Sequence, residues 1–458
     1  MKKVYVAVLV LLVLAVGAFV AFSSEGEIEL MDTHLSGAYQ FEDGSLVTIG
    51  PSNDQRLRML QYHDGKPLSL YFDGEKGFKA SHGFNSQSFF AKGQFQYGDD
   101  GEVLGATWHE DGKTQVVKKL PLTRKTVFFQ SGDLMLRGEL TIPEGEEPFP
   151  VVITVHGSED YSAVDFYHWP YILAANGIAG FKFDKRGTGG SDGEYTQHFP
   201  TLAGDVMAAV DFLKGDAAID ISRVNLIGFS QGGWISPLVA KQIDIQSYII
   251  GFGTTVPVPR EDRWGYVKQL LDNGYGEEEI AYADELNAQI TKVIFDHDES
   301  AWDGLLALKE LHQDAPWFKA IAGSDSLLGF VAEKLNHPLA DWVPDFGWKL
   351  YTKWKKSGND NGPGFNRTYD PIATLENVST PSLWLLAGED TSLPTPDTAA
   401  DLDRLQAAGL ATQYKIYPSA EHGNILYTTD ENGDRTYTGY VPSYFSDVVT
   451  YFKQQNGL

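Results

Sequence analysis

The sequence predicts an α/β protein with a mostly parallel sheet covered by helices on both faces, preceded by a small antiparallel β domain. From about residue 124 onward, short apolar runs alternate with helical stretches, a pattern typical of parallel strands joined by crossover helices. Before that point, residues 36 to about 120 contain short strand-like runs separated by five Asp-Gly pairs. Because Asp-Gly favours the positive φ angles of tight hairpin turns, these runs predict antiparallel strands.

These changes of pattern divide the chain into five segments. They are a signal peptide or N-terminal anchor, the β domain, the first part of the α/β core, a helical insertion and the second part of the core, at residues 1–23, 24–122, 123–255, 256–370 and 371–458.

The N-terminus indicates export. Lys2 and Lys3 precede Val4 to Phe22, an uncharged run of 19 residues, which resembles the charged and apolar regions of a signal sequence. The run is nearly long enough to span a bilayer, so an uncleaved anchor is the alternative. The sequence therefore predicts an extracytoplasmic protein, periplasmic or secreted, with residues 4–22 as an optional membrane tether.

Charge and composition exclude several classes of partner and cofactor. The 458 residues include 36 Lys and Arg against 62 Asp and Glu, a net charge of −26. This argues against nucleic acid, whose affinity depends on neutralising phosphates. The chain has no cysteine, so disulfides, thiolate zinc sites and a Cys nucleophile are excluded. It also has no H-E-x-x-H, no P-loop and no G-x-G-x-x-G after a strand, so we expect neither metal nor cofactor. Its oligomeric state is left open.

The β domain has no catalytic constellation of its own. Its strand-like runs include Ser45 to Ile49 and Gln94 to Tyr97. We therefore expect a module for packing or for substrate approach rather than a second active site.

The α/β core shows its strands and helices separately. A hairpin at Val127 to Gln130 and Leu134 to Ile142 leads in, and the expected parallel strands are 151–155, 179–183, 224–228, 248–252, 383–387 and 414–417. One helix face is indicated by apolar residues at helical spacing, namely Leu202, Val206, Ala209, Val210 and Leu213.

The insertion at 256–370 holds six of the ten tryptophans and is rich in helix formers, as in Glu277 to Ala288 and Leu305 to Leu311. We expect a helical lid over the carboxyl ends of the strands, where open α/β sheets bind ligands. The alternative is an ordinary helical subdomain whose aromatic residues form a core.

Two serines lie in a G-x-S-x-G pattern, Ser230 and Ser191. A nucleophilic serine of this kind needs a sharp turn between a buried strand and a helix. Ser230 has that context, because an apolar strand precedes it and a helix start follows. Ser191 lies instead in a Gly-rich loop, which turn chemistry explains. We therefore predict Ser230 as the nucleophile.

A serine hydroxyl needs a base, and the base needs an acid that orients it. Asp390 follows the strand at 383–387 and is preferred to Glu389, with Glu261 and Asp262 as remote alternatives. His422 follows the last strand and is the expected base, in the chain order Ser, Asp, His. His156 and His168 precede the nucleophile, and chain order alone does not exclude them.

The oxyanion hole is expected from two backbone N–H groups, those of Gln231 and of Ser158, with Glu159 as the alternative to Ser158. Such donors can supply about 3–4 kcal/mol each. His156 lies in the same loop as Ser158, and a structural role in the oxyanion hole fits it better than the role of base. Asp184 and Arg186 follow the strand at 179–183 and are expected to form a structural ion pair or loop brace.

Together these motifs resemble the α/β-hydrolase superfamily, near its bacterial serine aminopeptidase, prolyl-oligopeptidase and esterase D groups. The residues that carry the resemblance are V-H-G-S (155–158), F-D-K-R-G-T-G-G-S-D-G (183–193), G-F-S-Q-G-G-W (228–234), G-E-D (388–390) and E-H-G (421–423). The resemblance implies an α/β-hydrolase fold over residues 124–458 apart from much of the insertion. It also implies a triad of Ser230, Asp390 and His422, and it extends less specifically to the N-terminal β region of some exported members.

The expected activity is that of a serine hydrolase acting on a carboxylic ester of modest size. A serine peptidase acting on short peptides, aminopeptidase-like or prolyl-oligopeptidase-like, is the second reading. A binding protein that keeps the fold without activity is the third.

Overall fold

The computed structural model describes residues 33–335 and 366–458, apart from positions 55, 75, 297, 299, 323 and 432–434. The expected signal peptide or anchor, residues 1–23, lies outside the described residues, as does part of the insertion. Among the helices that the structure describes, none is both long and apolar enough to cross a membrane.

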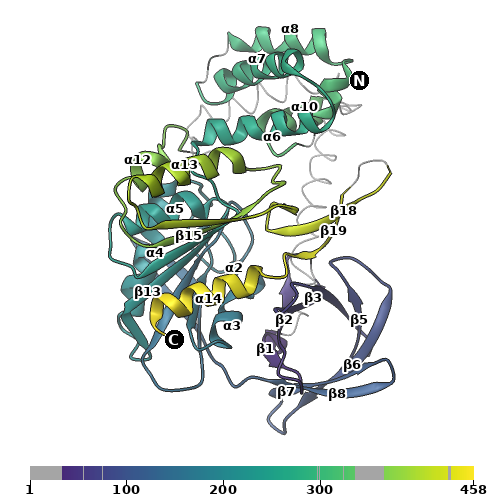
Figure 1. Cartoon of the computed structure of the whole chain (residues 1–458), viewed down its shortest axis with the longest axis vertical. Helices are drawn as coiled ribbons and strands as arrows, with labels where there is room; N and C mark the ends of the chain where they lie inside the picture. The colour runs from purple at the N-terminus through teal and green to yellow at the C-terminus, as the bar shows by residue number, and fades with distance from the viewer. Residues whose placement is uncertain are drawn as a thin grey trace, which may run out of the picture.

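The N-terminal β domain is a closed antiparallel barrel of eight strands (Figure 1). A short 3-10 turn, η2 (Thr33–Leu35), leads into it. The strands are β1 (Gly37–Gln40), β2 (Leu46–Ser52), β3 (Arg56–Gln61), β4 (Pro67–Phe72), β5 (Gly77–His82), β6 (Phe89–Tyr97), β7 (Val103–Glu110) and β8 (Lys113–Lys119). Each strand pairs with the next, and β1 closes the barrel against β8 through Tyr39 and Lys119.

The five Asp-Gly pairs lie in the hairpin turns predicted for them. They connect β1 to β2, β3 to β4, β4 to β5, β6 to β7 and β7 to β8. Their glycines have φ angles between 69° and 88°, a region that side chains with a Cβ rarely adopt. The predicted antiparallel β domain is therefore confirmed.

The core sheet has eight strands in the order β16-β15-β14-β13-β11-β12-β10-β9. The strands are β9 (Thr123–Ser131), β10 (Leu134–Ile142), β11 (Phe149–Val155), β12 (Ala179–Phe183), β13 (Ile219–Phe229), β14 (Ser247–Gly251), β15 (Ser382–Ala387) and β16 (Thr412–Tyr417). β9 and β10 run antiparallel to their neighbours, and the remaining strands pair in parallel. All six predicted parallel strands and the leading hairpin are confirmed.

The order of the strands reverses beside β11, which has β12 on one side and β13 on the other. Loops that leave neighbouring strands in opposite directions open a crevice at such a switch point, where α/β sheets bind ligands. The loops that follow β11 and β13 carry the predicted oxyanion residues and Ser230.

Helices cover both faces of the sheet. The bounds are α2 (Ala163–Phe166), α3 (Trp169–Ala174), α4 (Phe199–Leu213), α5 (Gly232–Ala240), α12 (Pro371–Leu375), α13 (Thr395–Ala407) and α14 (Tyr444–Asn456). The predicted apolar face of α4 is buried in one core with residues of α5 and α13. A second core joins α3 and α14 to the opposite face. A small sheet of β17 (Ala420–Glu421), β18 (Ile425–Thr429) and β19 (Arg435–Tyr440) follows β16.

The insertion between β14 and β15 is helical and lies at the top of Figure 1. Its described helices are α6 (Val258–Asp272), α7 (Glu277–Ile294), α8 (Ala301–His312), α9 (Pro316–Ala320) and α10 (Leu327–Leu335). They share a core that includes Tyr266, Leu286 and Trp317. Residues 336–365, with three of the six tryptophans, lie outside the described residues.

The barrel and the α/β core meet along a packed seam. The His168 ring lies 2.9 Å from Thr48 Oγ1 through Nδ1 and 3.2 Å from the Pro51 carbonyl through Nε2. A carbonyl only accepts, so Nε2 carries the proton and Nδ1 accepts from the threonine hydroxyl. Burial lowers the pKa of His168 to about 4, so the ring stays neutral and keeps both bonds near neutral pH. The N–H of Tyr440 adds a bond of 2.8 Å to the Gly65 carbonyl.

Candidate active site

Ser230 occupies a strained turn at the carboxyl end of β13, immediately before α5. Its φ angle is 49°, which costs a residue with a Cβ free energy and persists only where the surroundings hold it. Two backbone hydrogen bonds hold the turn. The Ser230 N–H donates to the Gly251 carbonyl (3.0 Å), and the Gly233 N–H donates to the Ser230 carbonyl (2.8 Å). The local structure is that predicted for a nucleophile on a strand-to-helix turn.

The glycines that flank Ser230 are required by close packing. A Cβ on Gly228 would lie 2.5 Å from the Ser236 hydroxyl oxygen, and one on Gly232 would lie 2.8 Å from the Val155 carbonyl oxygen. Both separations are shorter than van der Waals contact allows, so any larger residue would displace the turn.

His422 and Asp390 lie in direct contact. The imidazole Nδ1 is 3.0 Å from Oδ2 and 3.2 Å from Oδ1 of the carboxylate. Because an ionised carboxylate only accepts, Nδ1 carries the proton and Nε2 is left as the acceptor. Burial lowers the pKa of His422, but the charge and hydrogen bond of Asp390 outweigh it, so the pKa lies above its ordinary value.

Asp390, rather than Glu389, is the carboxylate that faces the histidine. Its side chain is almost fully buried, and Oδ1 accepts the backbone N–H groups of Ser392 (2.9 Å) and Leu393 (2.8 Å). Glu389 is half-exposed and its carboxylate lies 3.9 Å from Lys268 Nζ. The structure thus places the preferred acid against His422 and turns its neighbour toward the insertion.

The remote alternatives Glu261 and Asp262 lie on α6. Asp262 accepts the backbone N–H of Leu327 at 2.6 Å, which braces the insertion internally. The same helix reaches the acid loop through Trp264, whose indole N–H donates to the Asp390 carbonyl at 3.0 Å.

Two residues that the sequence reading missed support His422. The buried carboxylate of Glu421 accepts the N–H groups of His422 and Thr391, both at 2.8 Å, and so joins the histidine loop to the acid loop. Phe252, with a φ of 42°, packs edge-on against the imidazole at 5.0 Å between ring centroids. In the sequence the first is signalled only by its place beside His422, and the second by its place at the end of the expected strand 248–252.

The loop after β11 carries Ser158 close to the nucleophile. A Cβ on Gly157 would lie 3.3 Å from the Cβ of Ser230, so the loop and the serine are in contact. Tyr195 donates its hydroxyl to the Ser158 carbonyl. Gln231 is buried and forms the N-cap of α5, where backbone N–H groups lack a partner within the helix.

Lys185 holds the same loop from behind. Its buried ammonium donates to the carbonyls of Gly157 and Glu159, each at 2.7 Å. The Gly157 carbonyl and the Ser158 N–H belong to one planar trans peptide and point in opposite directions. The lysine therefore fixes the Ser158 N–H so that it faces away from the ammonium. Burial lowers the pKa of Lys185 to about 8.

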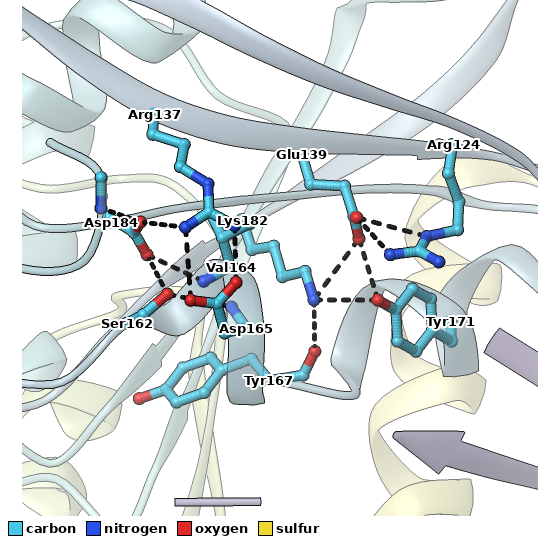
Figure 2. Close-up of polar contacts among 11 residues, drawn as sticks. Arg124, Arg137, Glu139, Ser162, Val164, Asp165, Tyr167, Tyr171, Lys182 and Asp184 are labelled. Carbon is cyan, nitrogen blue, oxygen red and sulfur yellow. Dashed lines mark hydrogen bonds and ion pairs between the residues drawn. The ribbon is translucent and has the colours of Figure 1, made fainter. Parts of the chain in front are cut away.

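Ser191 belongs to a structural network. Its hydroxyl donates to the Asp184 carbonyl at 2.7 Å and accepts the Arg137 backbone N–H at 2.9 Å. Figure 2 shows the Asp184 carboxylate turned toward the Arg137 guanidinium (3.4 Å) and the Ser162 hydroxyl (2.7 Å). The Ser191 hydroxyl thus both donates a hydrogen bond to the backbone and accepts one from it.

The prediction that Asp184 and Arg186 form an ion pair with each other is wrong, because each pairs with a different residue. Arg186 pairs with the buried Asp205 of α4 at 2.6 Å, whereas Asp184 binds Arg137 and also accepts the Val164 backbone N–H at 2.9 Å. The positive φ at Gly187, 73°, turns the chain directly after Arg186. Each still braces a loop, but against a different element.

His156 lies beneath the oxyanion loop, buried against the Phe183 ring at 5.5 Å between centroids. Burial, with the nearby Lys185 charge, lowers its pKa well below the ordinary value. His168 is engaged with the barrel. Neither histidine contacts an orienting carboxylate among the described residues, which separates both from His422.

Ser230 and His422 line one cavity of about 590 Å³, a volume within the range of small-molecule sites. Its walls are largely aromatic. They include Tyr167, Trp169, Phe229, Phe252, Tyr440, Tyr444 and Phe445, with the Glu159 carboxylate among them. Among the described residues, the insertion contributes nothing to this lining. The barrel contributes Ser52, Asn53, Asp54, Arg58, Leu60 and Phe84.

In the part of the chain that the structure describes, no cluster of three or more His, Asp or Glu side chains is arranged to hold a metal ion.

A family model described as "Serine aminopeptidase, S33" matches residues 146–262. The match covers the Ser158 loop, the Ser191 loop and Ser230, and it ends before Asp390 and His422.

Among curated proteins, the chain is similar to the esterase EstD of Thermotoga maritima. The two are 27% identical over 184 residues, which is 37% of this chain and 44% of that protein. The chain spans less than half the length of the curated relatives that it matches.

Among solved structures, the chain is similar to the Pyrococcus furiosus esterase Pf2001, with 14% identity and a TM-score of 0.41 over 73% of this chain and 93% of that one. It is also similar to the Pyrococcus horikoshii acylaminoacyl peptidase, with 13% identity and a TM-score of 0.43 over 89% of this chain and 56% of that one. The family match and the order of strands in the sheet confirm the predicted resemblance of this chain to the α/β-hydrolase superfamily.

Proposed function

We propose that the chain is a serine hydrolase that cleaves a carboxylic ester by acyl transfer to water. One observation carries the proposal. Ser230, at a φ of 49°, shares a cavity with His422, whose Nδ1 lies 3.0 Å from the Asp390 carboxylate. A weak hydroxyl nucleophile needs a base and an acid that orients the base, and here the base lines the same cavity as the serine.

In the proposed mechanism, Nε2 of His422 takes the proton of the Ser230 hydroxyl as Oγ attacks the ester carbonyl carbon. The N–H groups of Gln231 and Ser158 stabilise the oxyanion. The tetrahedral intermediate collapses, and His422 returns the proton to the leaving alkoxide, so an alcohol departs and an acyl-enzyme remains. Water, activated by the same imidazole, then releases the acid while Asp390 stabilises the imidazolium.

The ester is preferred because the cavity wall is mainly aromatic, which suits an apolar acyl group. The similarity to an esterase of Thermotoga maritima agrees with this choice.

A serine peptidase is the second candidate, and one residue favours it. An exopeptidase needs an acid for the substrate's ammonium group, and Glu159 lines the cavity with Ser230. The matching family model carries the name of an aminopeptidase. A non-catalytic binding protein is the third candidate, and labelling of Ser230 by a fluorophosphonate would exclude it.

The insertion is proposed as a lid. Its support is the place of the helices between β14 and β15 and the bond from Trp264 to the Asp390 carbonyl. An extracytoplasmic location, with residues 4–22 as a cleaved signal or a tether, is likewise a proposal that rests on Lys2, Lys3 and the apolar run. Fractionation of cells that express the full chain, with N-terminal sequencing of the product, tests it.

The substrate class is tested by one panel. Purified protein is assayed on p-nitrophenyl esters of increasing acyl length beside aminoacyl and prolyl anilides, with Ser230→Ala as the blank. Ester turnover that exceeds anilide turnover and disappears in Ser230→Ala supports the esterase. Anilide turnover that depends on both Ser230 and Glu159 would replace it with the peptidase.

A further inference from the structure

The barrel supplies part of the cavity that Ser230 lines, although the proposed nucleophile, base and acid all lie outside the barrel. Of the contributing residues, one ends β2, two lie in the turn between β2 and β3, two lie on β3, and Phe84 follows β5. The barrel is therefore placed to act on whatever occupies the cavity.

Phe84 is held rigidly in this wall. The Arg58 guanidinium lies 5.3 Å from the centroid of the Phe84 ring. The Tyr440 ring packs edge-on against the same ring, with 5.7 Å between the ring centroids. Its carbonyl accepts from Arg58 Nη1 and from the Ser69 hydroxyl, both at 2.8 Å. A ring fixed by both backbone and side-chain contacts forms a wall rather than a mobile cover.

The charge of Arg58 is balanced within the barrel. The guanidinium is almost fully buried and pairs with Asp54 at 2.7 Å. It also donates to the Ser69 hydroxyl at 2.7 Å. A buried cation that is paired and hydrogen-bonded in this way orients its neighbours and does not require a ligand anion. Arg58 thus acts as a positioning residue for Phe84.

The part of the barrel that lines the cavity is packed directly against the α/β core that carries Ser230. Leu60 and Tyr62 of the barrel share a core cluster with Tyr444 and Phe445 of α14, and the rings of Tyr62 and Phe445 are 6.2 Å apart. The bond from Tyr440 N to the Gly65 carbonyl, 2.8 Å, ties the residue behind Phe84 to the barrel as well.

We propose that Phe84, gripped by Arg58 and Tyr440, is the specificity-determining wall of the cavity and limits the length of the apolar acyl group that Ser230 accepts. This inference rests on the proposed serine hydrolase function. It assigns substrate selection to the barrel, with esters of short or medium acyl chains as the accepted class and long-chain esters as the excluded class.

The test compares two variants at one position with a matched control. Phe84→Ala should raise kcat/KM for p-nitrophenyl decanoate relative to the acetate by about tenfold, since each methylene newly accommodated is worth at least that in a hydrophobic pocket. Phe84→Trp should lower the same ratio. Each variant is compared with its own acetate kcat/KM, so a general loss of activity cancels in the ratio. Phe72→Ala removes an exposed barrel phenylalanine outside the cavity lining and should leave the ratio unchanged.

A variant at a second position keeps the test valid if the Phe84 variants fail to fold. Asn53 is exposed and lines the cavity, so Asn53→Trp should fold and should reduce decanoate turnover, while Gln87→Trp in an exposed loop should not. Fluorophosphonates with short and long alkyl chains give the same readout through labelling rates, independently of the natural substrate.

The outcomes separate the two proposals. If fluorophosphonate labels wild type but not Ser230→Ala, and the length profiles of the Phe84 and Asn53 variants equal that of wild type, the barrel wall is refuted while the hydrolase stands. If wild type is not labelled, the proposed function fails and the inference fails with it.

Discussion

The Asp390 carboxylate lies 3.0 Å from Nδ1 of His422, and this contact determines which nitrogen of the imidazole can act as a base. Because Nδ1 donates to the carboxylate, Nε2 keeps its lone pair for the cavity that Ser230 lines. Asp390 is itself held by two backbone N–H groups, so the orientation does not depend on substrate.

Asp390→Asn should lower kcat by roughly 10⁴-fold, because an amide that donates to Nδ1 selects the wrong tautomer. Steady-state kinetics on an ester measure this. Glu389→Gln is the matched control, because its half-exposed carboxylate faces Lys268 at 3.9 Å and loss of such a pair changes little. Equal losses in the two variants would refute the assignment of the acid.

The pH profile should report the same pair. Activity requires neutral His422, and its pKa is raised above 6.5 by Asp390 against the opposing effect of burial. The acidic limb of kcat/KM should therefore have its midpoint above pH 6.5. In Asp390→Asn the charge and the hydrogen bond that raise the pKa most are lost while burial still lowers it, so the residual activity should have its midpoint at lower pH. A midpoint that does not move would mean that Asp390 does not control the base.

Lys185→Met should lower kcat by about tenfold to a hundredfold with little change in KM, because displacing an oxyanion donor costs transition-state stabilisation. The loss follows from the bonds of Lys185 to the Gly157 and Glu159 carbonyls. Lys125→Met, which removes a half-exposed lysine paired with Asp216, is the control. A folded Lys185→Met enzyme with wild-type kcat would show that the clamp does not act on the oxyanion loop.

Ser191→Ala should keep activity within a few-fold and lower the free energy of unfolding by about 1–2 kcal/mol, because two backbone groups lose their partner. Ester assays and chemical denaturation measure the two effects. Loss of turnover without loss of stability would assign Ser191 a chemical role.

Local rules predicted much of this molecule. The Asp-Gly pairs predicted the hairpins, because tight turns need residues that tolerate positive φ angles. The apolar runs predicted the parallel strands, because strands covered on both faces consist mainly of apolar residues. The context of Ser230 likewise distinguished it from Ser191. In the structure the first lies at a φ of 49° and the second is bound within a loop network.

Contacts between distant segments could not be predicted. The closure of β1 on β8, the pairing of Arg186 with Asp205 and the clamp of Lys185 all join residues whose spacing carries no signal. The insertion is expected from the sequence to lie over the carboxyl ends of the strands, whereas among the described residues the lining of the cavity comes from the α/β core and the barrel. Packing between distant segments decides which of them faces Ser230.

Hydrolysis of p-nitrophenyl butyrate by the Ser230→Ala variant is the decisive measurement of whether Ser230 is the nucleophile. Ser230→Ala should lose roughly 10⁴-fold or more of its turnover while melting like wild type, and Ser191→Ala should retain turnover. A Ser230→Ala protein with full activity would contradict this assignment.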